Sequence, residues 1–131
     1  MGNINKMIID SHAHFIPPSL LEAIRDTSHE FSAIELLHND EGSFGFSFAG
    51  HKPTRPVSKM LFDVQGRLEW MDNNSIDVQV IGGWLDMFGY ELPAEQGQRW
   101  SMLINQHLSE FCSENRRFLP LASLPMQDGK S

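Results

Sequence analysis

Two histidines near the start of the chain have the spacing of metal ligands. His12 and His14 follow the apolar run Met7-Ile8-Ile9, which predicts a buried strand that continues to His14. Side chains alternate along a strand, so Asp10, His12 and His14 are expected on one face. Two imidazoles so placed can bind one metal ion together with ligands from other elements. Taken alone, the pair is about equally well interpreted as two strand-end histidines that only form hydrogen bonds.

The elements around these histidines alternate between strand and helix. Ser19 and Glu22 have the spacing of a capping box and predict the start of a helix. The expected elements, in chain order, are a strand over 7–14, a helix over 19–27, a β-hairpin within 31–59, a helix over 63–73, a strand over 78–81, a helix that begins near Pro93 and buries a stripe from Trp100 to Cys112, and a strand over 118–124. This α/β order predicts right-handed βαβ units and a parallel sheet. Active sites lie at the carboxyl ends of strands in such folds, which favours the metal-binding interpretation.

Composition excludes several classes of partner. Ten basic and seventeen acidic residues give a net charge of −7, which argues against a general nucleic-acid-binding protein. No apolar run approaches the ~18 residues of a membrane helix, and no apolar core of a secretory signal is present, so neither a membrane partner nor export is expected. The single Cys112 excludes an internal disulfide and agrees with a cytoplasmic protein.

The segment from Ile9 to Pro17, Ile-Asp-Ser-His-Ala-His-Phe-Ile-Pro, resembles the opening of the amidohydrolase superfamily. The branch most similar to it contains aminocarboxymuconate-semialdehyde decarboxylase and related decarboxylases. The His-x-His pair is shared with metal-dependent phosphoesterases and TatD-like nucleases. The likeness becomes more specific through Arg116-Arg117-Phe118 and Leu124-Pro125-Met126-Gln127, which follow at the family's distance.

The resemblance implies a TIM-like (β/α)8 barrel that binds one divalent metal, with zinc as the expected ion. His12 and His14 would be ligands, joined by a histidine and an aspartate of later strands. Such a barrel needs ~250 residues. Residues 1–131 are therefore expected to be an incomplete barrel domain of about three strands, with an insertion over about 31–60 that acts as a flap. The remaining ligands and the catalytic base are expected beyond Ser131, the full-length enzyme is expected to be a homodimer, and the chain alone is expected to be inactive.

Substrate-binding residues are also carried over from the resemblance. Arg55 matches, by its spacing from Asp63, an arginine that binds the substrate carboxylate in the decarboxylase; the alternative is a solvated loop arginine. Trp84, Met87 and Phe88 follow the second main strand on the same rim. They either form an apolar wall around a planar, unsaturated acid or simply pack the loop.

These observations predict a metal-dependent, non-oxidative decarboxylase of an unsaturated or aromatic carboxylic acid, which uses a metal-activated water. A hydrolase of a C–C, amide or lactone bond in the same superfamily is the nearest alternative, because it needs the same pair of histidines. A TatD-like or PHP-type phosphoesterase is more distant, since the sequence lacks a basic rim. An inert fragment is the remaining alternative.

Overall fold

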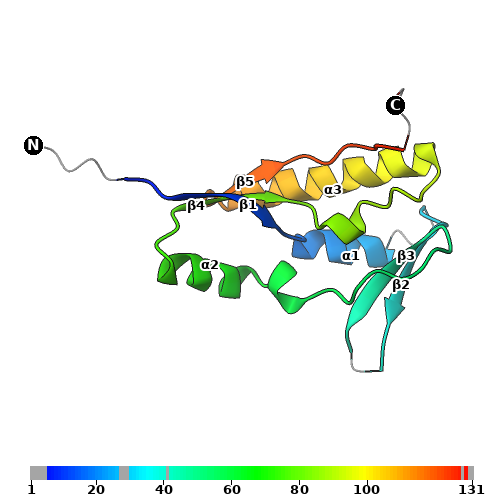
Figure 1. The fold of residues 1–131 in the computed structure, drawn as a ribbon, viewed down its shortest axis with the longest axis horizontal. Helices are drawn as coiled ribbons and strands as arrows, with labels where there is room; N and C mark the ends of the chain where they lie inside the picture. The colour runs from blue at the N-terminus through cyan, green and yellow to red at the C-terminus, as the bar shows by residue number, and fades with distance from the viewer. Residues whose placement is uncertain (1–5, 27–29, 41, 128, 130–131) are drawn as a thin grey trace, which may run out of the picture.

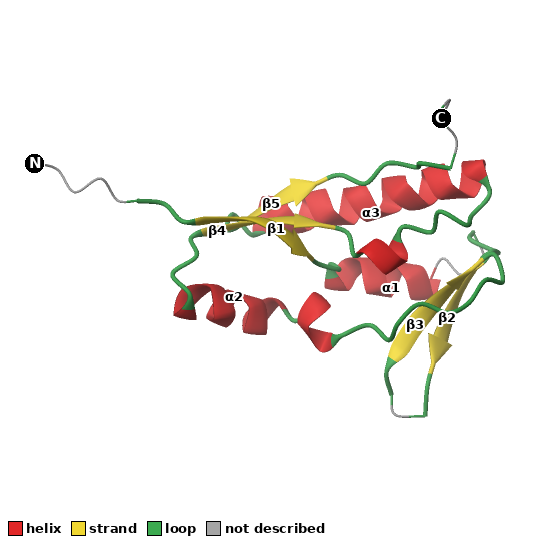
Figure 2. Cartoon of the chain, in the orientation of Figure 1, coloured by secondary structure: helices red, strands yellow, loops and turns green. Residues whose placement is uncertain are grey.

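The computed structural model describes residues 6–26, 30–40, 42–127 and 129. Strands and helices alternate along the chain around one central sheet (Figures 1 and 2). The elements are β1 (Ile9–His14), α1 (Pro18–Asp26), β2 (Ile34–His38), β3 (Phe44–Phe48), a 3-10 turn (Lys59–Leu61), α2 (Val64–Asn73), β4 (Val78–Gly82), a 3-10 turn (Leu85–Met87), α3 (Ala94–Glu114) and β5 (Phe118–Leu121). The predicted order of elements is confirmed.

The central sheet has three parallel strands in the order β1-β4-β5. Because both connections join parallel neighbours, each must cross over the sheet, and α2 and α3 are the helices that do so. Buried side chains show that both helices pack on one face: Ile81 of β4 and Phe118 of β5 lie in one cluster with Met71 of α2 and Leu108 of α3. The expected parallel βαβ arrangement is therefore confirmed.

The opposite face of this sheet carries no helix among the described residues. Val80 pairs with Leu119 and Gly82 with Leu121, so these residues lie out of phase with the buried Ile81 and Phe118. Leu119 and Leu121 are accordingly exposed. The sheet is thus covered on one side only, and the uncovered side is the one to which the candidate metal ligands belong.

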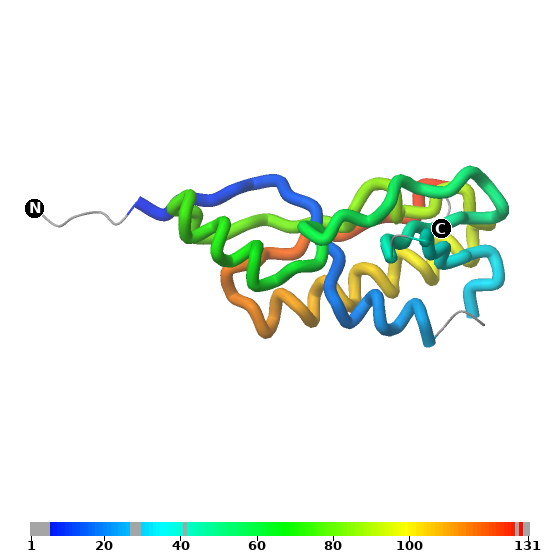
Figure 3. The backbone as a smooth tube through the Cα atoms, turned by 90° about the horizontal axis from the view of Figure 1, so that it is seen from below, coloured from blue at the N-terminus to red at the C-terminus, as the bar shows by residue number. Residues whose placement is uncertain are grey.

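A second apolar cluster joins the hairpin to the helices. β2 and β3 pair antiparallel as predicted, and Gly42 in their connection has a φ of +78°, which only glycine adopts without strain. The ring of Trp100 in α3 contacts the rings of Phe31, Phe46 and Phe48. Figures 1 and 3 both show α1 beside α3, next to the hairpin. The hairpin is therefore held by the same helix that covers the sheet.

Arg117 explains why the Arg-Arg-Phe segment stands before β5. Its guanidinium donates to the main-chain carbonyls of Ile76 and Asp77 and to the carboxylate of Asp72. These contacts join the turn between α2 and β4 to the start of β5. Arg117 therefore ties the amino-terminal ends of two neighbouring strands together.

Three sequence expectations fail locally. Helix α1 begins at Pro18, so Ser19 lies inside the helix and its hydroxyl pairs with His107 Nδ1 at 2.9 Å instead of capping. The predicted end of this helix, Thr27, lies outside the described residues. The run Met7-Ile8-Ile9 is exposed rather than buried, because it lies at and before the start of an edge strand. The last strand ends at Leu121, earlier than expected.

Candidate metal centre and its surroundings

A β-bulge in β1 decides which side chains share a face. Asp10 pairs with Gln79 and Ala13 pairs with Ile81, so two residues of β1 oppose one residue of β4 between them. Asp10 therefore lies on the helix face with Gln79, and the prediction that it shares a face with His12 and His14 is wrong. Ala13 packs against the helix-side cluster, which turns its two neighbours, His12 and His14, to the other face.

The two imidazoles are neighbours on the uncovered face. Their ring centroids are 4.9 Å apart and the ring planes are nearly perpendicular, at 88°. His14 Nδ1 lies 2.9 Å from the main-chain oxygen of Gly83. Since a carbonyl oxygen only accepts, the ring must donate from Nδ1, which leaves the lone pair on Nε2. A second ring nitrogen held by a carbonyl is the usual arrangement of a histidine that binds a metal.

These residues fit part of a metal site. Zinc accepts imidazole nitrogens at ~2.0–2.1 Å, and two histidines on one face can supply two of its ligands. Within the described residues, no group of three or more histidine, cysteine, aspartate or glutamate side chains could hold a metal. Asp10 is turned away, and its carboxylate accepts from Gln79 Nε2 at 2.8 Å and from the main-chain amide of His12 at 3.3 Å. The further ligands implied by the resemblance stay an expectation.

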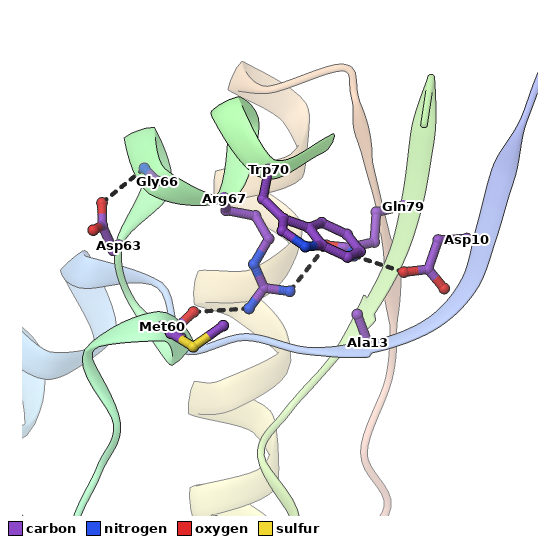
Figure 4. Close-up of a pocket in the computed structure, with 8 residues that line it drawn as sticks. All are labelled: Asp10, Ala13, Met60, Asp63, Gly66, Arg67, Trp70 and Gln79. Atoms are coloured by element: carbon purple, nitrogen blue, oxygen red, sulfur yellow. Dashed lines mark hydrogen bonds between the residues drawn. The ribbon is translucent and has the colours of Figure 1, made fainter. Parts of the chain in front are cut away.

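On the helix side of β1, hydrogen bonds join Asp10, Gln79 and Arg67 into a polar network, here called the relay, which was not predicted from the sequence (Figure 4). Gln79 is 1% exposed, and its amide bonds Asp10 on one side and Arg67 Nη1, at 3.1 Å, on the other. Arg67 Nη2 donates to the carbonyl oxygens of His14, at 3.1 Å, and Met60, at 2.8 Å. The one sequence signal for this relay is a glutamine inside the apolar strand Val78-Gln79-Val80-Ile81.

The relay lines a cleft of about 380 Å³ between β1, β4 and α2. The other lining residues are Ala13, Met60, Asp63, Gly66 and Trp70, all labelled in Figure 4. Burial lowers the pKa of the Arg67 guanidinium, against the attraction of the Asp10 carboxylate. The guanidinium also lies 5.6 Å from the ring centroid of Phe15. Arg67 is therefore held by polar partners and by an aromatic ring at once.

The predicted substrate-binding arginine is paired with a carboxylate. Arg55 Nε and Nη2 each donate to an oxygen of Asp86 at 2.8 Å, and the Arg55 side chain is 74% exposed. The guanidinium also lies 5.9 Å from the ring centroid of Trp84. Hydrogen bonds from Arg55 lower the pKa of Asp86. A substrate carboxylate would have to replace Asp86, and the assignment of Arg55 stays a prediction.

The three apolar residues after β4 differ in burial. Trp84 and Met87 lie in the core cluster, and the main-chain carbonyl of Met87 accepts a 2.7 Å hydrogen bond from Trp100 Nε1. Phe88 is half-buried, with its ring 5.7 Å from that of Tyr90. Trp84 and Met87 therefore contribute to packing, and contact of any of the three with a substrate stays a prediction.

Two residues of α3, Cys112 and His107, have structural roles. Cys112 is buried, and this burial raises the pKa of its thiol to about 11, which is typical of an unreactive structural cysteine. His107 is half-buried and bonds Ser19 across α1 and α3, so it links two helices.

The sequence of the chain is similar to that of a curated decarboxylase. No protein-family profile matches the chain. A curated protein of Dictyostelium discoideum, 2-amino-3-carboxymuconate-6-semialdehyde decarboxylase, is 28% identical over 124 residues, which are 91% of this chain and 33% of that protein. The resemblance to the amidohydrolase-superfamily decarboxylases is confirmed. The chain spans about a third of the length of this relative.

Two solved structures have a fold similar to that of the chain. Apo IDCase of Metarhizium anisopliae matches with a TM-score of 0.64 and 17% identity over 92% of this chain and 35% of that one. The 5-carboxyvanillate decarboxylase LigW of Sphingomonas paucimobilis matches with a TM-score of 0.58 and 23% identity over 93% and 36%. The predicted fold, part of a TIM-like barrel with a small hairpin insertion, is confirmed. Within the part of the chain that the structure describes, no helix is long and apolar enough to cross a membrane.

Proposed function

We propose that this chain supplies the first two metal ligands of a metal-dependent decarboxylase that acts on an unsaturated or aromatic carboxylic acid. The observation that carries the proposal is the pair His12 and His14, which share the uncovered sheet face, with His14 Nδ1 held by the carbonyl of Gly83. The names of the curated relative and of the two solved structures support decarboxylation as the reaction class.

In this proposal, each part of the chain has a limited task. The divalent metal, with zinc expected, supplies an activated water when bound. His12 and His14 hold the metal through ring nitrogens, and Gly83 orients the His14 ring. Arg55 exchanges Asp86 for the carboxylate of the substrate, which its forked donors match in shape and charge. The Trp84 ring lies beside the Arg55 guanidinium, and Trp84, Met87 and Phe88 form the apolar boundary in this proposal, with residues 31–60 as a flap.

The setting of the enzyme is part of the same proposal. A single buried cysteine suits a reducing compartment, and we place the protein in the cytoplasm as a homodimer in its full-length form. No nucleic acid is needed as a partner. The 131-residue chain by itself has no substantial activity in this proposal, because a catalytic zinc takes three or more protein ligands and the described residues bring two together.

The test is metal binding by the chain and by four variants. Titration with Zn²⁺ and Co²⁺ should show that His12→Ala and His14→Ala each abolish binding, since one imidazole is left. His51→Ala is the matched control, because His51 is exposed in a loop outside the sheet, and it should bind as the unchanged chain does. Undiminished binding by the double variant His12→Ala/His14→Ala would refute the assignment.

The reaction class needs a second measurement. Protein purified under native conditions, with any chain that copurifies, should release CO₂ from a carboxylated muconate or an aromatic carboxylic acid. Consumption of the substrate with water incorporated and without CO₂ release would indicate a hydrolase instead.

A further inference from the structure

We propose that Arg67 is a positioning residue for the metal centre: it holds the bulge in β1 that turns His12 and His14 to one face and Asp10 to the other. This inference rests on the proposed function of the two histidines. It concerns a residue on the opposite side of β1 from the imidazoles, which therefore acts through the strand and does not bind the metal itself.

The bulge matters because alternation alone would place a different set of side chains together. In a regular strand, Asp10 would share the face of His12 and His14 and would add a carboxylate beside the two imidazoles. The extra residue between Asp10 and Ala13 reverses the phase of the strand. The centre thus becomes a pair of imidazoles without an adjacent carboxylate, while Asp10 lies half-buried on the helix side.

Both flanks of the bulge are held by one connected set of hydrogen bonds. On the amino-terminal flank, Asp10 accepts from the Gln79 amide at 2.8 Å. On the carboxyl-terminal flank, the carbonyl of His14 accepts from Arg67 at 3.1 Å. Gln79 and Arg67 are bonded to each other at 3.1 Å, so the two flanks are joined through the guanidinium (Figure 4). Asp10 also accepts from the amide of His12, which lies inside the bulge.

Contacts outside β1 also hold the Arg67 guanidinium in place. Its Nη2 also donates to the carbonyl of Met60 at 2.8 Å, and its guanidinium lies near the ring of Phe15. Gln79 is almost fully buried, so its amide cannot exchange these partners for water. Loss of the guanidinium would leave the Gln79 oxygen and the His14 carbonyl without their donor. The main-chain atoms of a candidate ligand would then be free to shift.

The test compares Arg67→Met with Arg117→Met. Arg117 is the matched control, because it also donates to two main-chain carbonyls and one side chain, but it ties the other end of the sheet and contacts neither histidine. Both variants should lower the free energy of unfolding. Only Arg67→Met should weaken Co²⁺ binding, by about 10- to 100-fold as for lost outer partners of metal ligands, and change the visible Co²⁺ spectrum. Equal losses of affinity in the two variants would overturn the proposal.

Further variants and a metal-free measurement test the role of Arg67 even if Arg67→Met does not fold or the chain does not bind Co²⁺. If Arg67→Met does not fold, two milder variants replace it. Gln79→Met removes the side chain that links Asp10 to Arg67 but leaves Arg67 bonded to the His14 carbonyl, whereas Arg67→Lys removes the guanidinium. Gln79→Met should therefore weaken Co²⁺ binding less than Arg67→Lys does. In metal-free chain, ¹⁵N shifts should show His14 protonated at Nδ1, and Arg67→Lys should mix the two tautomers. An unchanged tautomer would overturn the positioning role. Failure of the unchanged chain to bind Co²⁺ would refute the proposed function, while the tautomer experiment would still judge Arg67.

Discussion

Trp100 is the residue whose replacement should reveal most about how the hairpin is held. It is 0% exposed, it contacts three phenylalanine rings, and its Nε1 donates to the carbonyl of Met87 at 2.7 Å. The substitution Trp100→Phe keeps an aromatic ring but removes this donor. It leaves a buried carbonyl unpaired, at a cost of ~1–3 kcal/mol. The smaller ring adds a cavity term of roughly 1 kcal/mol, so the expected loss is about 2–4 kcal/mol.

The assay is urea unfolding followed by far-ultraviolet circular dichroism, because the change itself alters tryptophan fluorescence. With a slope of about 2 kcal/mol/M, the midpoint should fall by roughly 1–2 M without a change of slope. Trp70→Phe is the control: the same chemical change at a side chain that is 45% exposed should cost under about 0.5 kcal/mol. Equal shifts in the two variants would show that the Met87 hydrogen bond and the burial of Trp100 do not stabilise the fold as argued.

Two further predictions concern α3. Burial raises the pKa of the Cys112 thiol to about 11, above its ordinary value of 9.0, so the unfolded chain loses this proton first and the free energy of unfolding should fall as pH rises between the two values. In Cys112→Ala, the urea midpoint should lose this part of its pH dependence. The same fall of the midpoint with pH in both proteins would contradict the prediction. Gly97→Ala would place a methyl group on the amide of Gln127, which donates to the carbonyl of Gly89. Because the Gln127 amide must move and give up this bond, thermal unfolding should show less than the gain of ~0.4–1 kcal/mol that Gly-to-Ala gives at an unstrained site. A full gain would mean that the Gln127 amide does not pack on Gly97.

The elements of this fold could be predicted because their signals are local. The apolar stripe from Trp100 to Cys112 repeats with the period of a helix, and the structure buries Trp100, Ile104, Leu108 and Cys112 as expected. Asp63 caps α2 through its side chain, as a residue before a helix often does. Such patterns depend on residues close in sequence, and these were sufficient for the order of strands and helices.

The parts that could not be predicted depend on residues far apart in sequence. The bulge in β1 is joined to Gln79 and Arg67, and no pattern within 9–14 encodes an extra residue. Alternation was therefore right in placing His12 and His14 on one face, and wrong for Asp10, which lies on the other side of the register shift. Asp86, the partner of Arg55, lies 31 positions away and has no signature of its own.

The parallel order of the sheet also sets the order in which the chain can fold. Ile8 and Asp77, which meet at the start of β1 and β4, are 69 positions apart, whereas Asp77 and Arg117, which meet at β4 and β5, are 40 apart. Closing the longer loop costs only about 0.5 kcal/mol more, so the difference affects stability little. Contacts of lower sequence separation form sooner, however, and β4, α3 and β5 make the more local unit. We therefore expect β1 to dock last, so that His12 and His14 come together only when the rest of the sheet already exists.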